Sequence, residues 1–147
     1  MRYESTRGSR EYKSSTEAII RGIAEDRGLY VPVEIPALPL KIEEMRGKTY
    51  QQIAFEIIHA YFDEYTDSEM KSCIEGAYDG KFEDPQIVPV KKAGGAWFME
   101  LYHGKTAAFK DMALSILPHL MTTAAKKNHA DKEIAVSYTH LTLPTIA

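Results

Sequence analysis

The sequence predicts an α/β fold in two parts: a small helical amino-terminal unit, then the start of a strand–helix–strand unit with a parallel sheet. Three patterns of the form Ser/Thr-x-x-Glu/Gln within the first 80 residues predict the helical unit. Strand patterns at 96–102 and 133–136, with an apolar helical pattern at 106–127 between them, predict the strand–helix–strand unit. The 147 residues, 44% of them hydrophobic, are enough for one globular core.

The amino-terminal segment is expected to begin with an extended or looped stretch and then a short helix. Ser14, followed three residues later by Glu17, is a capping-box pattern that begins this helix, and Gly28 suits its end. A short extended piece is expected at 29–33. The prolines that follow make residues 32–41 a stiff connector.

Two more helices are expected before residue 80. Thr49 begins the first, in which apolar residues recur at helical spacing. Thr66 begins the second, which we expect to run to about Tyr78 before Asp79 and Gly80 end it.

The second half of the chain is expected to hold the strands of the sheet. Residues 86–90 form one strand pattern, and Gly94 with Gly95 predicts a turn after it. Residues 96–102 carry large apolar side chains on both faces, which favours a buried strand of a mixed or parallel sheet. We expect the following helix to begin at Thr106 and to be kinked by Pro118.

Charge and cysteine content exclude several classes of protein. A net charge of −3 with no basic stretch argues against a nucleic-acid partner. Cys73 is the single cysteine, so we interpret it as structural and expect a reducing compartment. The first residues lack an apolar signal region, and no apolar run approaches the ~20 residues that cross a bilayer. We therefore expect a cytoplasmic protein without a membrane partner or a metal.

Lys110 is the strongest candidate for chemistry. It lies among alanine, phenylalanine, methionine and leucine residues, near the expected start of a helix. The positive end of the helix dipole and the apolar neighbours both disfavour an ammonium ion there. A neutral amine can attack an aldehyde cofactor. From composition alone, a lysine that lies along the helix edge and pairs with Asp111 remains the alternative.

The loop before Lys110 has groups that suit an anion. His103, Lys105 and Thr106 can donate hydrogen bonds, and Gly104 allows the backbone to approach a ligand. An ordinary connecting loop capped by Thr106 is the structural alternative. Lys105 is a rival reactive lysine, although a loop position leaves it more exposed.

The stretch Met99-Glu-Leu-Tyr-His-Gly-Lys-Thr-Ala-Ala-Phe-Lys-Asp-Met-Ala-Leu114 resembles the cofactor-lysine segment of the threonine synthase family, which reads E-L-[FY]-H-G-P-T-x-A-F-K-D. A second resemblance lies near the amino terminus, in Tyr3-x-Ser-Thr-Arg-Gly8 and in the segments at 17–26 and 28–32. Together the two span residues 1 to about 136. The resemblance implies a fold-type II (tryptophan synthase β-like) domain that binds pyridoxal 5'-phosphate.

The resemblance also implies an activity and roles for particular residues. The reaction is the conversion of O-phospho-L-homoserine and water to L-threonine and phosphate, carried out by a lyase. Lys110 would be the catalytic residue and bind the cofactor, with Phe109 and Asp111 beside it. Substrate-binding residues carried over from the family are His103, Gly104, Thr106 and Arg7. For Arg7 a structural salt bridge remains an equal alternative.

Three departures from the family pattern matter. Lys105 replaces the family proline, and Arg27 replaces a glycine, which would strain the backbone if that position needs a positive φ. The stretch 137–147 lacks the glycine-rich phosphate loop of the family and resembles translated adapter sequence. We therefore expect an amino-terminal domain at 1–94, the start of the cofactor domain at 95–136 and a non-native tail at 137–147. A truncated chain of this kind is expected to hold the cofactor weakly, to be inactive alone and to expose apolar surface.

Two other functions fit the same residues. The first is another fold-type II phospho-lyase, which activity on other phosphorylated amino alcohols would reveal. The second is a non-catalytic helical binding module in which Lys110 is structural. The gene sequence beyond residue 136 discriminates between them, because a glycine-rich phosphate loop there supports an enzyme.

Overall fold

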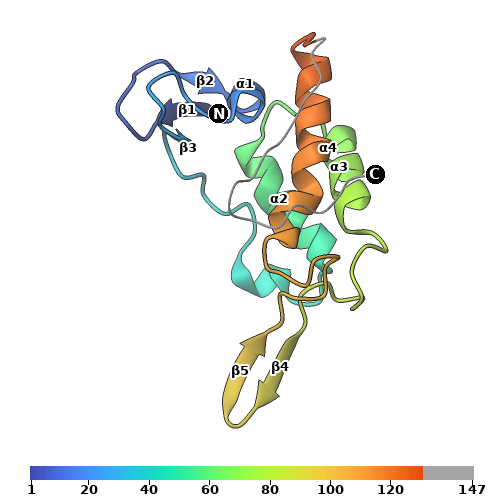
Figure 1. Cartoon of the computed structure of the whole chain (residues 1–147). Coiled ribbons are helices and arrows are strands. Elements are labelled where there is room, and N and C mark those ends of the chain that lie inside the picture. The colour runs from blue at the N-terminus through green and yellow to red at the C-terminus, as the bar shows by residue number, and fades with distance from the viewer. Residues whose placement is uncertain (131–147) are drawn as a thin grey trace.

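The computed structural model describes residues 1–130, in which helices combine with two small antiparallel sheets (Figure 1). The helices are α1 (Ser15–Arg21), the 3-10 helix η1 (Ile42–Met45), α2 (Tyr50–Tyr61), α3 (Asp67–Tyr78) and α4 (Asp111–Lys127). The strands are β1 (Arg2–Ser5), β2 (Lys13–Ser14), β3 (Tyr30–Pro32), β4 (Val90–Ala93) and β5 (Ala96–Met99). The predicted strand at 133–136 and the predicted tail at 137–147 lie outside the described residues.

The first sheet has the order β2-β1-β3 and is held by the side chain of Asp26. Its carboxylate accepts hydrogen bonds from the Ser5 hydroxyl at 2.6 Å and from the Gly28 amide at 2.9 Å. These bonds, the Ser5 bond first, hold the pKa of Asp26 below its usual value. A Cβ atom on Gly28 would lie only 2.0 Å from the Ser5 hydroxyl oxygen, so the packing requires glycine there.

The helix starts predicted at Ser14, Thr49 and Thr66 are confirmed. Ser14, Thr49 and Thr66 each accept a hydrogen bond from the backbone amide three residues later, whose own side chain bonds back. The predicted end of the first helix is wrong. The helix stops at Arg21, because Gly22 adopts a φ of 68° that ends it six residues earlier than expected.

Arg27 occupies the position at which the family carries glycine, and its φ is +65°. Left-handed backbone costs a residue with a Cβ atom about 1–2 kcal/mol. We expect Arg27→Gly to raise the free energy of unfolding by ~0.5–1 kcal/mol, after allowance for the greater freedom of glycine in the unfolded chain. Urea denaturation measures the change, with Arg10→Gly, in an exposed loop without a positive φ, as the control. A less stable Arg27→Gly protein would contradict this account.

Helices α3 and α4 share one hydrophobic core with Ala54 of α2, and partly buried residues of α1 and α2 pack against it (Figure 1). Met70 of α3 is fully buried at its centre. Two tyrosine hydroxyls bond to α4. Tyr65, which precedes α3, donates to the carbonyl of Leu120, and Tyr78 of α3 donates to that of Met112, both at 2.8 Å. Burial raises the pKa of the Cys73 thiol in the same core, which agrees with a structural cysteine.

The strands β4 and β5 form a hairpin that extends away from the helices (Figure 1). Gly94 and Gly95, both at positive φ, make the predicted turn. The strand predicted at 86–90 is wrong, since β4 begins only at Val90. The prediction of a buried strand at 96–102 is also wrong for residues 1–130, because both faces of the hairpin are exposed and Trp97 retains 69% of its accessible surface. The predicted exposure of apolar surface is confirmed.

Within residues 1–130 no helix is both long enough and apolar enough to cross a membrane. The longest of these helices, α4, contains Pro118 in its interior as predicted.

Candidate functional site

Lys110 lies at the point where the chain enters α4. It is the N-cap residue of that helix, is buried with 8% exposure, and its carbonyl accepts hydrogen bonds from the amides of Leu114 at 2.9 Å and Ala113 at 3.2 Å. The prediction that the helix begins at Thr106 is therefore wrong. Lys110 precedes the helix by one residue instead of lying in its first turn.

The helix begins at Asp111 because the carboxylate of that residue accepts two hydrogen bonds from Thr106. The amide of Thr106 donates to Asp111 Oδ2 at 2.7 Å, and the Thr106 hydroxyl donates to Oδ1 at 2.6 Å. The hydroxyl is thus engaged with a carboxylate and does not cap a helix. Ala107 follows with a φ of 52°, outside the helical region. We call residues 103–111 the lysine loop.

Gly104 is buried where the lysine loop folds against itself. A Cβ atom at this position would lie 2.6 Å from both Cβ and Oδ2 of Asp111, closer than nonbonded atoms approach. The glycine is therefore explained by packing within the loop. Gly104, Thr106 and Asp111 together form a closed turn that ends directly at Lys110.

His103 begins the lysine loop and is bound by a residue that the sequence analysis did not identify. Its Nε2 lies 2.8 Å from Oε2 of Glu100, and the same oxygen lies 2.8 Å from Nζ of Lys91. The Tyr102 ring lies against the imidazole, with centroids 4.6 Å apart, and the His103 carbonyl accepts from the Glu83 amide at 2.9 Å. The only sequence signal for this pair was the spacing of three residues between Glu100 and His103.

Two neighbouring side chains, those of Lys91 and His103, change the pKa of the Glu100 carboxyl. Lys91 first, and then His103, lower the pKa of the Glu100 carboxyl to about 2. Because the folded-state pKa is depressed, the stabilisation is present above the unfolded-state value of ~4.3 and is lost as the pH falls through about 2.

We expect the Glu100 carboxyl to remain ionised at pH 3 in the folded chain. A ¹³C titration of the carboxyl carbons measures this, with Lys91→Ala as the variant that should move the midpoint back toward the ordinary range. An ordinary midpoint in both proteins would contradict the ion pair.

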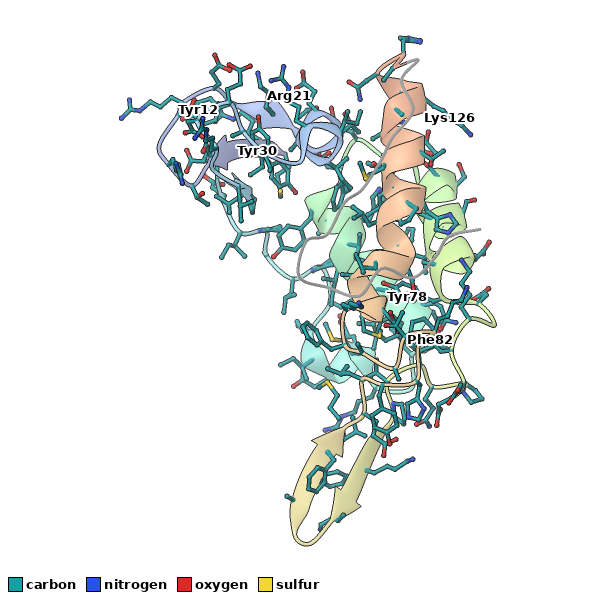
Figure 2. The ribbon with its side chains drawn as sticks, in the orientation of Figure 1. Tyr12, Arg21, Tyr30, Tyr78, Phe82 and Lys126 are labelled. Carbon is teal, nitrogen blue, oxygen red and sulfur yellow. The ribbon has the colours of Figure 1, made fainter. Side chains whose placement is uncertain are left out.

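The start of α4 rests on aromatic residues from the end of α3. Tyr78, bonded to Met112, and Phe82, whose ring centroid lies 6.0 Å from that of Tyr78, are seen beside the lower end of the helix in Figure 2. A hollow of about 320 Å³ is lined by both residues and by Ile87. A second, of about 360 Å³, lies between α2 and α3. Neither of these two hollows is lined by a residue of the lysine loop.

The structure brings together the predicted residues of the lysine loop but not Arg7. Arg7 follows β1, and its guanidinium donates to the carbonyl of Asp26 at 3.5 Å. The sheet that contains β1 lies toward the carboxyl end of α4, whereas the lysine loop lies at its amino end (Figure 1). Phe109, the predicted neighbour of the cofactor, is 72% exposed.

Comparison with known families gives a match over residues 2–78 to the model described as the threonine synthase N terminus. The chain belongs to the threonine synthase family. Threonine synthase of Schizosaccharomyces pombe is 37% identical over 134 residues, which cover 88% of this chain and 26% of that protein. Threonine synthase of Pseudomonas aeruginosa is 36% identical over 124 residues, 82% of this chain and 26% of that protein.

The fold of the described residues is that of the first part of a threonine synthase. The crystal structure of PLP-bound threonine synthase from Brucella melitensis matches with a TM-score of 0.79 and 30% sequence identity, over 88% of this chain and 28% of that one. The chain thus spans about a quarter of the length of the relatives that it matches. The predicted family and fold class are confirmed.

Proposed function

We propose that these residues form the amino-terminal part of an enzyme that converts O-phospho-L-homoserine and water to L-threonine and phosphate, with pyridoxal 5'-phosphate as cofactor. The observation that carries the proposal is the buried position of Lys110 at the end of a closed turn, in a chain of this family. The related structure from Brucella melitensis is itself described as PLP-bound.

The residues around Lys110 suit this cofactor. A lysine amine can bond to its aldehyde carbon, and Lys110 is buried at the end of the closed turn. When bound, the cofactor supplies an electron sink that makes loss of the substrate α-proton possible. Lys110 holds the cofactor, and its amine then accepts and returns protons at the substrate carbons. The hydrogen bonds from Thr106 to Asp111 hold the backbone of the loop that carries Lys110.

The remaining residues have supporting roles in the proposal. Asp111 acts through the loop, since each of its carboxylate oxygens accepts a hydrogen bond from Thr106, and Phe109 offers an exposed ring to the cofactor. His103, Gly104 and Thr106 border the substrate, and Arg7 would reach an anionic group only from another face. We also propose the domain division at 1–94 and 95–136, a cytoplasmic location and a small-molecule substrate as the enzyme's partner.

The test is an assay of the complete gene product for release of phosphate and threonine from O-phospho-L-homoserine. Other phosphorylated amino alcohols serve as competing substrates. Preferential turnover of one of these would replace threonine synthase with a related phospho-lyase. A product that holds no cofactor at Lys110 would overturn the enzyme assignment altogether.

A further inference from the structure

The side chain of His103 is fixed by a carboxylate that belongs to neither the lysine loop nor α4. Glu100 retains 14% of its side-chain surface and His103 12%, so both lie mostly out of water. Their contact, 2.8 Å between Oε2 and Nε2, has the length of a charge-assisted hydrogen bond. Lys91 reaches the same carboxylate oxygen from β4, across the hairpin, at 2.8 Å.

The chemistry of this contact shows which nitrogen of the His103 imidazole carries the hydrogen that lies between the two residues. Glu100 is ionised near neutral pH, because its pKa is lowered to about 2, and an ionised carboxylate can only accept. The hydrogen between the two residues therefore belongs to Nε2 of His103. That leaves Nδ1 as the ring nitrogen that can accept a proton or, once protonated, donate to a phosphate oxygen.

We propose that Glu100 is a positioning residue that holds the His103 imidazole by its Nε2–H, so that Nδ1 is the nitrogen presented to the phosphate group of the substrate. The part that concerns the substrate rests on the proposed function. The part that concerns the ring does not. The lysine loop is thereby anchored at both ends, by Glu100 at His103 and by Asp111 at Thr106.

The ring assignment is tested on the 147-residue chain labelled with ¹⁵N-histidine. One of its five histidines is assigned to position 103 with a His103→Gln variant. At pH 8 we expect a protected Nε2–H proton on His103, because the ionised Glu100 carboxylate beside it can only accept. Glu100→Ala should speed its exchange with water at least about tenfold, because a hydrogen bond to a charged group is lost. Glu83→Ala is the matched control, since the Glu83 backbone amide that donates to the His103 carbonyl is retained in that variant.

Each outcome decides the ring assignment. Equal exchange in the wild-type and Glu100→Ala chains would overturn it, and so would a wild-type ring whose hydrogen lies on Nδ1. The position of the hydrogen in the wild-type ring is measured without the Glu100→Ala variant, so a Glu100→Ala chain that fails to fold still leaves the proposal falsifiable.

The substrate part is tested in the complete gene product. Glu100→Ala should raise KM for O-phospho-L-homoserine severalfold and change kcat less, whereas an unchanged KM would overturn that part. Absence of threonine formation in the wild-type enzyme would instead refute the proposed function and leave the ring measurement standing.

Discussion

A Lys110→Ala variant of the complete gene product should form threonine at least ~10³-fold more slowly than the wild type. The proposed enzyme needs this amine both to hold the cofactor and to move protons, and loss of a general acid–base group alone costs about 10²–10⁴-fold. Within residues 1–130, Lys110 is the one lysine that is buried. Phosphate release and threonine formation are measured together.

The matched control for this variant is Lys105→Ala. Lys105 is exposed and lies five residues earlier in the same loop, so its loss should leave the rate within a fewfold of wild type. Borohydride reduction followed by peptide mass analysis locates the cofactor adduct in each protein. An adduct on Lys105, or normal threonine formation by Lys110→Ala, would show that the reactive lysine has been misidentified.

A Gly104→Ala variant of the chain should lose about 1–3 kcal/mol of unfolding free energy, the range that overpacking of a tight interior costs. The added Cβ atom would lie 2.6 Å from Cβ and Oδ2 of Asp111, and Asp111 cannot move away without breaking both hydrogen bonds from Thr106. Urea denaturation gives the loss, and hydrogen exchange at the Thr106 amide shows whether the closed turn has opened.

Stability and exchange together test the account of Gly104. Substitution of exposed Lys105 by alanine should change neither quantity, because its side chain lies outside the turn. In an Asp111→Gly background, Gly104→Ala should cost much less unfolding free energy than it costs in the wild-type chain, since the two positions are in contact. A Gly104→Ala chain as stable as wild type, with a protected Thr106 amide, would refute the close approach.

Local patterns in the sequence predicted the helix starts well. Ser14, Thr49 and Thr66 each need only a partner three residues ahead to form a capping box, so their bonds do not depend on the rest of the chain. Thr106 failed as a helix start for the opposite reason. The Thr106 hydroxyl donates to the carboxylate of Asp111, five residues later, and no capping rule covers that spacing.

The hairpin and the histidine contact depended on information that a single strand pattern does not contain. Apolar residues on both faces of 96–102 indicated burial, yet β5 pairs only with β4 among residues 1–130, and Trp97 is exposed. Similarly, Lys91 and Glu100 meet only because the turn at Gly94 and Gly95 brings the two strands together. Lys110 was found from its neighbours alone, and the resemblance of residues 99–114 supplied its role.

Helix α4 is the last described element in the chain and also fills the centre of its core, through Ile116, Leu120 and Ala124. During synthesis on the ribosome, the apolar faces of α1 and α3 that contact α4 therefore stay exposed until more than 120 residues have emerged. Folding of this core is consequently late and long-range, a topology that slows folding and exposes the nascent chain to aggregation. Helix α4, which begins directly after Lys110, is therefore also the element that covers these apolar faces.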